Sequence, residues 1–307
     1  MQSSLLSAVV FDGVGLHSGA PVRMVVRPAP VDHGIVFLRT DLPAARARIP
    51  ARWDAVVPSK LCTLLANPQG DSVSTIEHVM AALAGCGISN ALIEIDGPEV
   101  PILDGSAEPF VRGFLAAGVA GQAAPVMALK VLRAVEVREG EAVARLEPSD
   151  SIEMDFTIDF TDAAIGRQEK HLNLSNGTFV RELCDSRTFC RQADVDAMRA
   201  NGLALGGTLE NAVVVQGDRV LSPGGLRHKD EPVRHKMLDA LGDLSLAGGP
   251  VLGRYVGIRA GHAMTNRLLR KLFETPGAYA WIACNGLSGG KLPGVGVTRA
   301  DLPRITL

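Results

Sequence analysis

Alternating polar and apolar positions mark the expected strands in the first part of the chain. Residues 5–40 are predicted to form β structure, and the alternation is clearest at 22–27 and 35–39. A further strand is expected at 91–95. The pattern therefore predicts β structure on both sides of one helical segment.

That helical segment covers residues 75–84. Ser74 or Thr75 is the expected cap at its start, and Gly85 and Gly87 are expected to end it. A second helix is predicted to begin near residue 107.

The second half of the chain repeats this plan. The predicted elements there are strands at 129–138, 142–147, 152–160 and 251–259, a helix from Glu231 and a helix over 262–273. A weak internal similarity between 77–84 and 234–241 suggests a duplication.

We therefore expect two related α+β domains, 1–124 and 125–307, joined in the small, apolar, glycine-containing segment 118–125. Domains that face each other would bring His78 and His235 to one interface, where ligand sites often form.

The most informative chemical pattern lies in the helix predicted from Glu231. His235, Asp239 and Asp243 follow one another at intervals of four, so they share one face of that helix. A histidine and an aspartate one turn apart are a sound way to present two metal ligands. On spacing alone, an ion pair on a surface helix is the more typical explanation.

Glu77-His78 supplies what such a site lacks. His78 would be a third ligand, and Glu77 would lie beside a metal-bound water as general base. Zinc lowers the pKa of its water to about 7, so the combination predicts a zinc hydrolase. Taken alone, the dipeptide is common in solvated helix turns.

Three further residues are candidates for the same site. His262 is a candidate general acid that Asp243 would orient and keep protonated, although a histidine at a turn is more often structural. Thr188 on its own looks like an ordinary loop residue. Lys236 could serve an anionic substrate, whereas most lysines are simply exposed.

Composition excludes several classes of partner. A formal net charge of −2 and 4% aromatic residues over 307 positions give no basis for nucleic acid as the main partner. Five cysteines without a C-x-x-C pair argue against a disulfide scaffold and favour the cytosol. The N-terminus lacks the basic region of a signal peptide, and no run of about 18 apolar residues is present. We expect an enzyme that acts on a small molecule.

Motifs along nearly the whole chain resemble those of the UDP-3-O-acyl-N-acetylglucosamine deacetylase family, zinc amidases that commit Gram-negative bacteria to lipid A synthesis. The motifs are Gly-Val-Gly-Leu-His-Ser-Gly at 13–19, Arg-Pro-Ala-Pro at 27–30, Ser-Thr-Ile-Glu-His at 74–78, Asp-Gly-Ser-Ala at 104–107, Ser-Arg-Thr-Phe at 186–189, Val-Arg-His-Lys-Met-Leu-Asp at 233–239 and Gly-His-Ala at 261–263.

The resemblance implies a role for each residue of the site. The implied zinc ligands are His78, His235 and Asp239, with Glu77 as general base. The remaining roles are His262 as general acid supported by Asp243, Thr188 as donor to the tetrahedral oxyanion and Lys236 on the phosphate side of the substrate.

The resemblance also implies a fold. It consists of two two-layer α/β-sandwich domains whose helices pack between the two sheets, with the active site at the domain interface. An insert, expected at about 190–220, forms a hydrophobic passage for the acyl chain, which Met198, Leu203 and Leu205 could line. Phe189 and Phe160 are further candidates for substrate contact, with Phe160 near the nucleotide.

The sequence departs from the family pattern at two places. Cys190-Arg191 stands where the family usually has Gly-Phe, and Asp162-Ala163 stands where His-Pro is common. Neither place touches the implied metal chemistry, so both bear on the fit of the sugar or the acyl chain.

The expected reaction is hydrolysis of the N-acetyl group of UDP-3-O-(3-hydroxyacyl)-N-acetylglucosamine. The expected cofactor is one Zn²⁺, with Fe²⁺ as the alternative in the cell. The alternatives are another metal amidohydrolase, an iron(II) oxygenase, since two histidines and a carboxylate also form its facial triad, and a non-catalytic sugar-nucleotide-binding or zinc-stabilised protein. We expect a cytoplasmic monomer, and peripheral contact with the inner membrane is inferred only from the acyl chain of the substrate.

Overall fold

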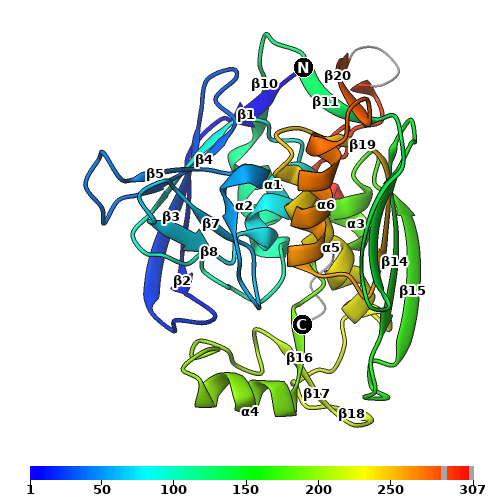
Figure 1. The fold of residues 1–307 in the computed structure, drawn as a ribbon. Helices are drawn as coiled ribbons and strands as arrows, with labels where there is room; N and C mark the ends of the chain where they lie inside the picture. The colour runs from blue at the N-terminus through cyan, green and yellow to red at the C-terminus, as the bar shows by residue number, and fades with distance from the viewer. Residues whose placement is uncertain (285–288, 304–307) are drawn as a thin grey trace.

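The main helices of the protein lie between two β-sheets. The computed structural model describes residues 1–284 and 289–303. In Figure 1 the sheet of the N-terminal part lies on one side, the large sheet of the C-terminal part lies on the other, and the main helices fill the layer between them. This arrangement confirms the predicted α+β fold.

The first sheet has five strands, all from the N-terminal part. Their order is β2-β3-β9-β4-β5, with β2 at Val9–Val14, β3 at Pro21–Pro28, β9 at Ala91–Ile95, β4 at Ile35–Arg39 and β5 at Arg48–Pro50. Only the β4–β9 pair within it is parallel. Met24, Val26, Phe37 and Ile93 are fully buried, because the inner face of the sheet rests on the helices.

The second sheet has seven strands from the C-terminal part. The order is β12-β13-β19-β11-β20, and the hairpin β14-β15 joins it through β19. The strands are β11 Val126–Val131, β12 Val135–Glu139, β13 Ala142–Glu147, β14 Ile152–Asp159, β15 Arg167–Asn173, β19 Val251–Ile258 and β20 Tyr279–Cys284.

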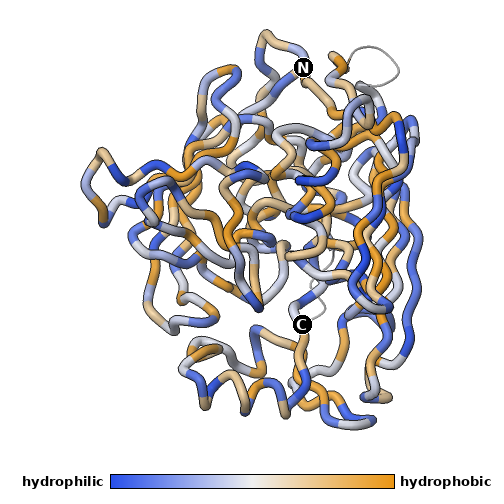
Figure 2. The backbone as a smooth tube through the Cα atoms, viewed as in Figure 1, coloured by the Kyte–Doolittle hydropathy of each residue, from blue (hydrophilic) through white to orange (hydrophobic). Residues whose placement is uncertain are grey.

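The helical layer brings the two halves into contact. It contains α1 Glu77–Gly85, α2 Glu108–Ala117, α3 Thr178–Glu182, α5 Glu231–Ser245 and α6 His262–Glu274. Helix α1 packs directly on α5, and Gly242 marks the closest approach, because a Cβ there would lie 2.1 Å from the carbonyl oxygen of Glu77. A single apolar core joins residues of both sheets through this layer, and Figure 2 shows strongly apolar residues in the strands on both sides of it.

Shorter elements complete the fold. In the N-terminal part they are β1 Ser3–Leu5, which pairs with β10 Val119–Gly121, the turn η1 Trp53–Ala55, and the sheet of β6 Val56–Val57, β7 Leu64–Ala66 and β8 Ser72–Ser74. In the C-terminal part they are β16 Phe189–Arg191, α4 Gln192–Ala200, β17 Val213–Gln216, β18 Arg219–Val220 and the turn η2 Arg299–Asp301. The segment from β16 to β18 projects from the helical layer in Figure 1, and we name residues 189–220 the insert.

Three local predictions need correction. Ile76 is the N-cap of α1 and no side chain caps this helix, because Thr75 has a φ of 58° and its hydroxyl donates to Glu99 instead. The single strand predicted at 129–138 is two strands in the structure, since β11 ends at Val131 and β12 begins at Val135. The predicted linker 118–125 contains strand β10.

The boundary between the two domains stays a prediction. Among the described residues, no sheet contains strands from both sides of the boundary between residues 124 and 125. Strands before this boundary pair only with each other. The last residues of the predicted second domain, 304–307, lie outside the described part. Within that part no helix is long and apolar enough to cross a membrane.

Candidate active site

Three side chains of the kind that bind metals meet between α1 and α5. His78 lies in the first turn of α1, while His235 and Asp239 lie one turn apart on α5. One ligand atom from each lies within 4.8 Å of the others. His235 Nε2 lies 3.3 Å and His78 Nε2 lies 3.6 Å from Asp239 Oδ1. The structure thus brings together the three residues predicted as ligands.

The backbone around the cluster sets the orientation of His235. Its Nδ1 lies 3.0 Å from the carbonyl oxygen of Ser186, so Nδ1 carries the proton and Nε2 presents its lone pair to the cluster. Gly242 permits the close contact of the two helices that carry the cluster. The geometry therefore depends on packing of elements distant in sequence.

The charges of the cluster fit a divalent cation. Burial and the neighbouring His235 lower the pKa of His78 to about 3, and burial also lowers that of His235, so both rings are neutral at pH 7. Burial opposes ionisation of Asp239, but the adjoining His235, followed by Lys236 and His262, holds its pKa well below the usual range. Asp239 Oδ1 has no hydrogen-bond partner among the described residues although it is buried. Two neutral imidazoles and an unpartnered carboxylate oxygen are a donor set for a metal ion.

Glu77 lies beside this cluster and is not part of it. Its Oε2 accepts a hydrogen bond of 3.0 Å from the backbone N–H of Thr63, and its Oε1 lies 3.8 Å from His262 Nε2. Burial raises the pKa of Glu77 to about 7; the carboxylates of Asp239 and Asp243 add to this effect and His262 opposes it. A carboxyl group with that pKa can accept a proton at neutral pH and release it again.

His262 and Asp243 form the second polar pair of the site. His262 Nδ1 lies 2.8 Å from Asp243 Oδ2, and the hydroxyl of Thr63 donates to the other oxygen of Asp243. Burial acts to lower the pKa of His262, but Asp243 and then Glu77 outweigh it and raise the pKa to about 9. His262 is therefore held protonated, with Nε2 pointed toward Glu77 and toward Asp239 Oδ2 at 3.8 Å.

Lys236 neighbours the cluster on α5. Its Nζ lies 2.7 Å from Asp239 Oδ2. Burial acts to lower the pKa of Lys236, but Asp239 outweighs this and raises it. The ammonium group is therefore charged, and it adjoins the cavity that opens beside the cluster.

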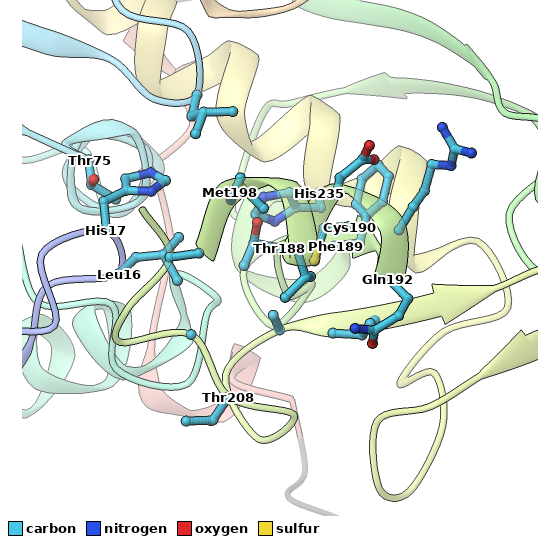
Figure 3. A pocket seen from close by; sticks show the side chains of 18 of the residues that line it. Leu16, His17, Thr75, Thr188, Phe189, Cys190, Gln192, Met198, Thr208 and His235 are labelled. Carbon is cyan, nitrogen blue, oxygen red and sulfur yellow. The ribbon is translucent and has the colours of Figure 1, made fainter. Parts of the chain in front are cut away.

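That cavity has a volume of about 680 Å³ and extends from the cluster into the insert. Phe160, Phe189 and Met198 line it, and so does Thr188, whose backbone bonds to Gly105 and Val213 fix its position. Figure 3 shows His17, Leu16 and Thr75 on one side of this space and Thr188, Phe189 and Met198 on the other.

Leu203 and Leu205 do not line the cavity. Both are exposed. The backbone N–H groups of Leu205 and Gly206 donate to the carbonyls of His17 and Leu16, and that of Leu203 donates to the carbonyl of Met198. The apolar lining in the insert comes instead from Val195, Ala212 and Val214 with Met198.

Several contacts that shape the site could not be predicted from the sequence. Thr63 contacts both Glu77 and Asp243, and the carbonyl of Ser186 orients His235. The segment that contains Ser186 and Thr188 is held by a buried ion pair between Arg187 and Glu231, with a Nε–Oε1 distance of 2.9 Å. Two of these contacts are made by backbone atoms, which no residue pattern reveals. Arg187 lies in one of the family motifs, but the motif does not indicate that Glu231 is its partner.

Most of the chain is similar to proteins of one family. A family model described as UDP-3-O-acyl N-acetylglycosamine deacetylase matches residues 2–274. A protein of Phenylobacterium zucineum (strain HLK1), named UDP-3-O-acyl-N-acetylglucosamine deacetylase, is 49% identical over 278 residues, which cover 91% of this chain and 95% of that protein. Proteins with the same name are 47% identical in Shewanella sp. (strain W3-18-1), over 92% of both chains, and 46% identical in Shewanella violacea, over 88% of this chain and 89% of that protein.

Proposed function

The chain belongs to the UDP-3-O-acyl-N-acetylglucosamine deacetylase family, and from this premise we propose that it hydrolyses the N-acetyl group of UDP-3-O-(3-hydroxyacyl)-N-acetylglucosamine. The products are acetate and the free amine, and the reaction is the committed step of lipid A biosynthesis. The observation that carries the proposal is the position of His262 Nε2, 3.8 Å from Glu77 Oε1 and 3.8 Å from Asp239 Oδ2. An acid and a base thus adjoin one cluster of metal-binding side chains.

His78, His235 and Asp239 would hold the ion, for which we propose Zn²⁺ with Fe²⁺ as the alternative in the cell. When bound, such an ion is a Lewis acid that polarises the amide carbonyl and acidifies water. Two imidazoles and one carboxylate suit both metals, so the metal content of protein purified without oxygen distinguishes them.

Glu77 and His262 would move the protons of the reaction. Glu77 Oε1 accepts a proton from the attacking water, since its pKa of about 7 leaves it half ionised at neutral pH. His262 Nε2 donates a proton to the departing nitrogen, since its pKa of about 9 keeps it charged. Asp243 holds the ring of His262 through Nδ1 and supports its charge.

The cavity wall would position the substrate. The hydroxyl of Thr188 would donate to the oxyanion, and Lys236 would face the phosphate side. The insert would take the acyl chain along Phe189 and Met198, with Phe160 closer to the nucleotide. Leu203 is exposed, so it would contact the acyl chain only if its loop turned inward on binding.

The cellular setting is part of the same proposal. We propose a cytoplasmic monomer of two domains, 1–124 and 125–307, that contacts the inner membrane only peripherally when it takes up its acylated substrate. Support comes from the nature of a UDP-sugar, which is a cytoplasmic metabolite, and from thiols that are free at Cys62, Cys86, Cys184 and Cys190.

The first experiment measures acetate release from UDP-3-O-(3-hydroxymyristoyl)-N-acetylglucosamine. Activity that is lost on chelation, returns with zinc and is largely absent in Glu77→Ala would support the proposal. Failure of the metal-loaded wild type to release acetate, across several acyl lengths, would refute it. Oxygen consumption, measured in parallel with Fe²⁺, tests the oxygenase alternative.

A further inference from the structure

An ion pair joins the loop after β14 to the last residue of β16. Arg191, the last residue of β16, places its Nε 2.6 Å from Asp162 Oδ2 in the loop after β14. The arginine side chain is 40% exposed and that of the aspartate only 13%. Residues 29 positions apart are thus connected at the base of the insert.

Asp162 holds a third segment at the same point. Its Oδ1 accepts a hydrogen bond of 2.8 Å from the backbone N–H of Gly217, in the turn between β17 and β18. The carbonyl of Gly217 in turn accepts one of 2.9 Å from the N–H of Ala164. One carboxylate therefore links the loop after β14, the end of β16 and the β17–β18 turn.

The residues next to this link form the wall of the cavity. Phe160 lies two positions before Asp162, and Phe189 two before Arg191, and their rings meet edge to face with centroids 5.4 Å apart. Phe189 also meets the ring of His235 at 6.2 Å. Displacement of β16 would thus move a ring that contacts both the cavity and the metal-binding cluster.

Helix α4 has little other anchorage. It begins directly after Arg191, and Val195 is its buried residue. Val195 packs with Ala212 and Val214 in an apolar cluster separate from the main core. A small cluster provides little burial energy, so polar contacts at the helix start determine how firmly this wall is held.

We propose that the Asp162–Arg191 pair is a positioning device that fixes the β16–α4 wall of the cavity and thereby sets how well the cavity retains an acyl chain. The assignment of the acyl chain rests on the proposed function; the fixing of the wall does not. Arg191 also lines the cavity. In this proposal neither residue takes part in the chemistry, and both act through the position of Phe189 and α4.

Amide hydrogen exchange tests the fixing of the wall without any substrate. Asp162→Asn removes the charge and keeps an oxygen that can accept from Gly217, and Arg191→Met keeps most of the side-chain length. We expect faster exchange in β16, α4 and the β17–β18 turn, and unchanged exchange in α1 and α5. The matched control is Asp71→Asn, which breaks the pair of Arg46 and Asp71, with side chains 52% and 8% exposed, away from the insert.

Kinetics on substrates of different acyl length test the effect on binding. For a long acyl chain we expect KM to rise roughly three- to tenfold in either variant, with kcat within about twofold, because a half-exposed ion pair contributes modestly. For a short acyl chain the rise should nearly vanish. The double variant should resemble the single ones, since both remove the same contact.

Three outcomes would overturn the proposal. The first is unchanged hydrogen exchange in the insert. The second is faster exchange with an unchanged dependence of KM on acyl length. The third is a KM that rises equally for all acyl lengths in Arg191→Met and not in Asp162→Asn, which would mean that Arg191 binds the phosphates directly. If the wild type releases no acetate at all, the proposed function fails, while hydrogen exchange still decides whether the pair fixes the wall.

Discussion

Glu77 and the three proposed metal ligands adjoin one another, but they would have separate tasks. Glu77 directs its Oε1 toward His262, whereas His78, the next residue, directs its ring to Asp239. Neighbouring positions on a helix point about 100° apart, so one turn of α1 can serve the metal and the proton separately.

Replacing Glu77 should therefore remove activity and leave the metal in place. For Glu77→Gln we expect kcat to fall about 10²- to 10⁴-fold, because a positioned base contributes that much. Metal content, measured by elemental analysis, should match that of the wild type. Loss of the metal together with the activity would instead make Glu77 a ligand.

In the proposed mechanism, the pH dependence of kcat/KM is set by the protonation of two groups. Glu77, with a pKa of about 7, must lose its proton, so the rate rises through that pH. His262, with a pKa of about 9, must keep its proton, so the rate falls above that pH. A bound divalent cation repels protons and lowers both values.

Variants assign the alkaline limb of that profile. Asp243→Asn should move it to lower pH, because Asp243 raises the pKa of His262. His262→Gln should abolish it. An alkaline limb that survives in His262→Gln would exclude this residue as the acid.

At the scale of elements, the start of α5 and the Ser186–Thr188 segment act as one unit. Arg187 and Glu231 are buried, and Glu231 Oε1 also accepts from the backbone N–H of Arg187. This pair fixes the carbonyl of Ser186 that orients His235.

Breaking this pair on one side should weaken both the fold and the metal site. For Arg187→Met we expect the free energy of unfolding to fall by about 3–5 kcal/mol, because Glu231 is left as an unpaired buried charge. Metal affinity should fall about 10- to 100-fold, as for other contacts that orient a ligand. Urea unfolding and competition with a chelator measure the two effects.

The double variant Arg187→Met with Glu231→Leu is the control. It should regain much of the stability, because no unpaired charge remains, but not the metal affinity. Equal recovery of both would mean that the pair does not orient the site.

Elements with a strong local pattern could be predicted from sequence, and those set by tertiary contact could not. Strands 91–95 and 142–147 and the helix from Glu231 match the structure, because alternation or helical spacing defines them. Strand β15, of alternating exposed and half-buried residues, was not predicted, because its stability comes from pairing along β14. The prediction that Thr75 caps α1 was wrong, because its hydroxyl donates a hydrogen bond to Glu99 instead.

The candidate site likewise has features that the sequence predicts and features that depend on tertiary contact. The interval of four between His235 and Asp239 points to a metal site in the sequence itself. The contacts of Thr63 join residues 14 and 180 positions away, and such contacts exist only in the folded chain.

At the scale of the whole molecule, the metal-binding cluster joins the two halves of the chain. His78 comes from α1, beside the first sheet, and His235 and Asp239 come from α5, which contacts β14 of the second. An ion bound there would crosslink helices from both halves.

Chelation should therefore lower the stability of the entire protein. With free metal at 100 times its Kd, binding adds about 2.7 kcal/mol to the free energy of unfolding. We expect the Tm to fall by several degrees after metal removal, in one cooperative transition seen by calorimetry. In His78→Ala the same treatment should change the Tm far less. An equal fall in this variant would place the stabilising ion elsewhere.

The close approach of α1 and α5 at Gly242 also limits which sequences this fold can accept. The atom that a Cβ would meet is the carbonyl oxygen of Glu77, which belongs to the main chain and has no alternative rotamer. Consider a library randomised at position 242, in which cells grow only if the encoded enzyme is active. We expect glycine alone to persist at this position. Leu241 and Leu244, which are buried on the same helix, should tolerate other aliphatic residues. The position would be intolerant although its residue contributes no chemistry.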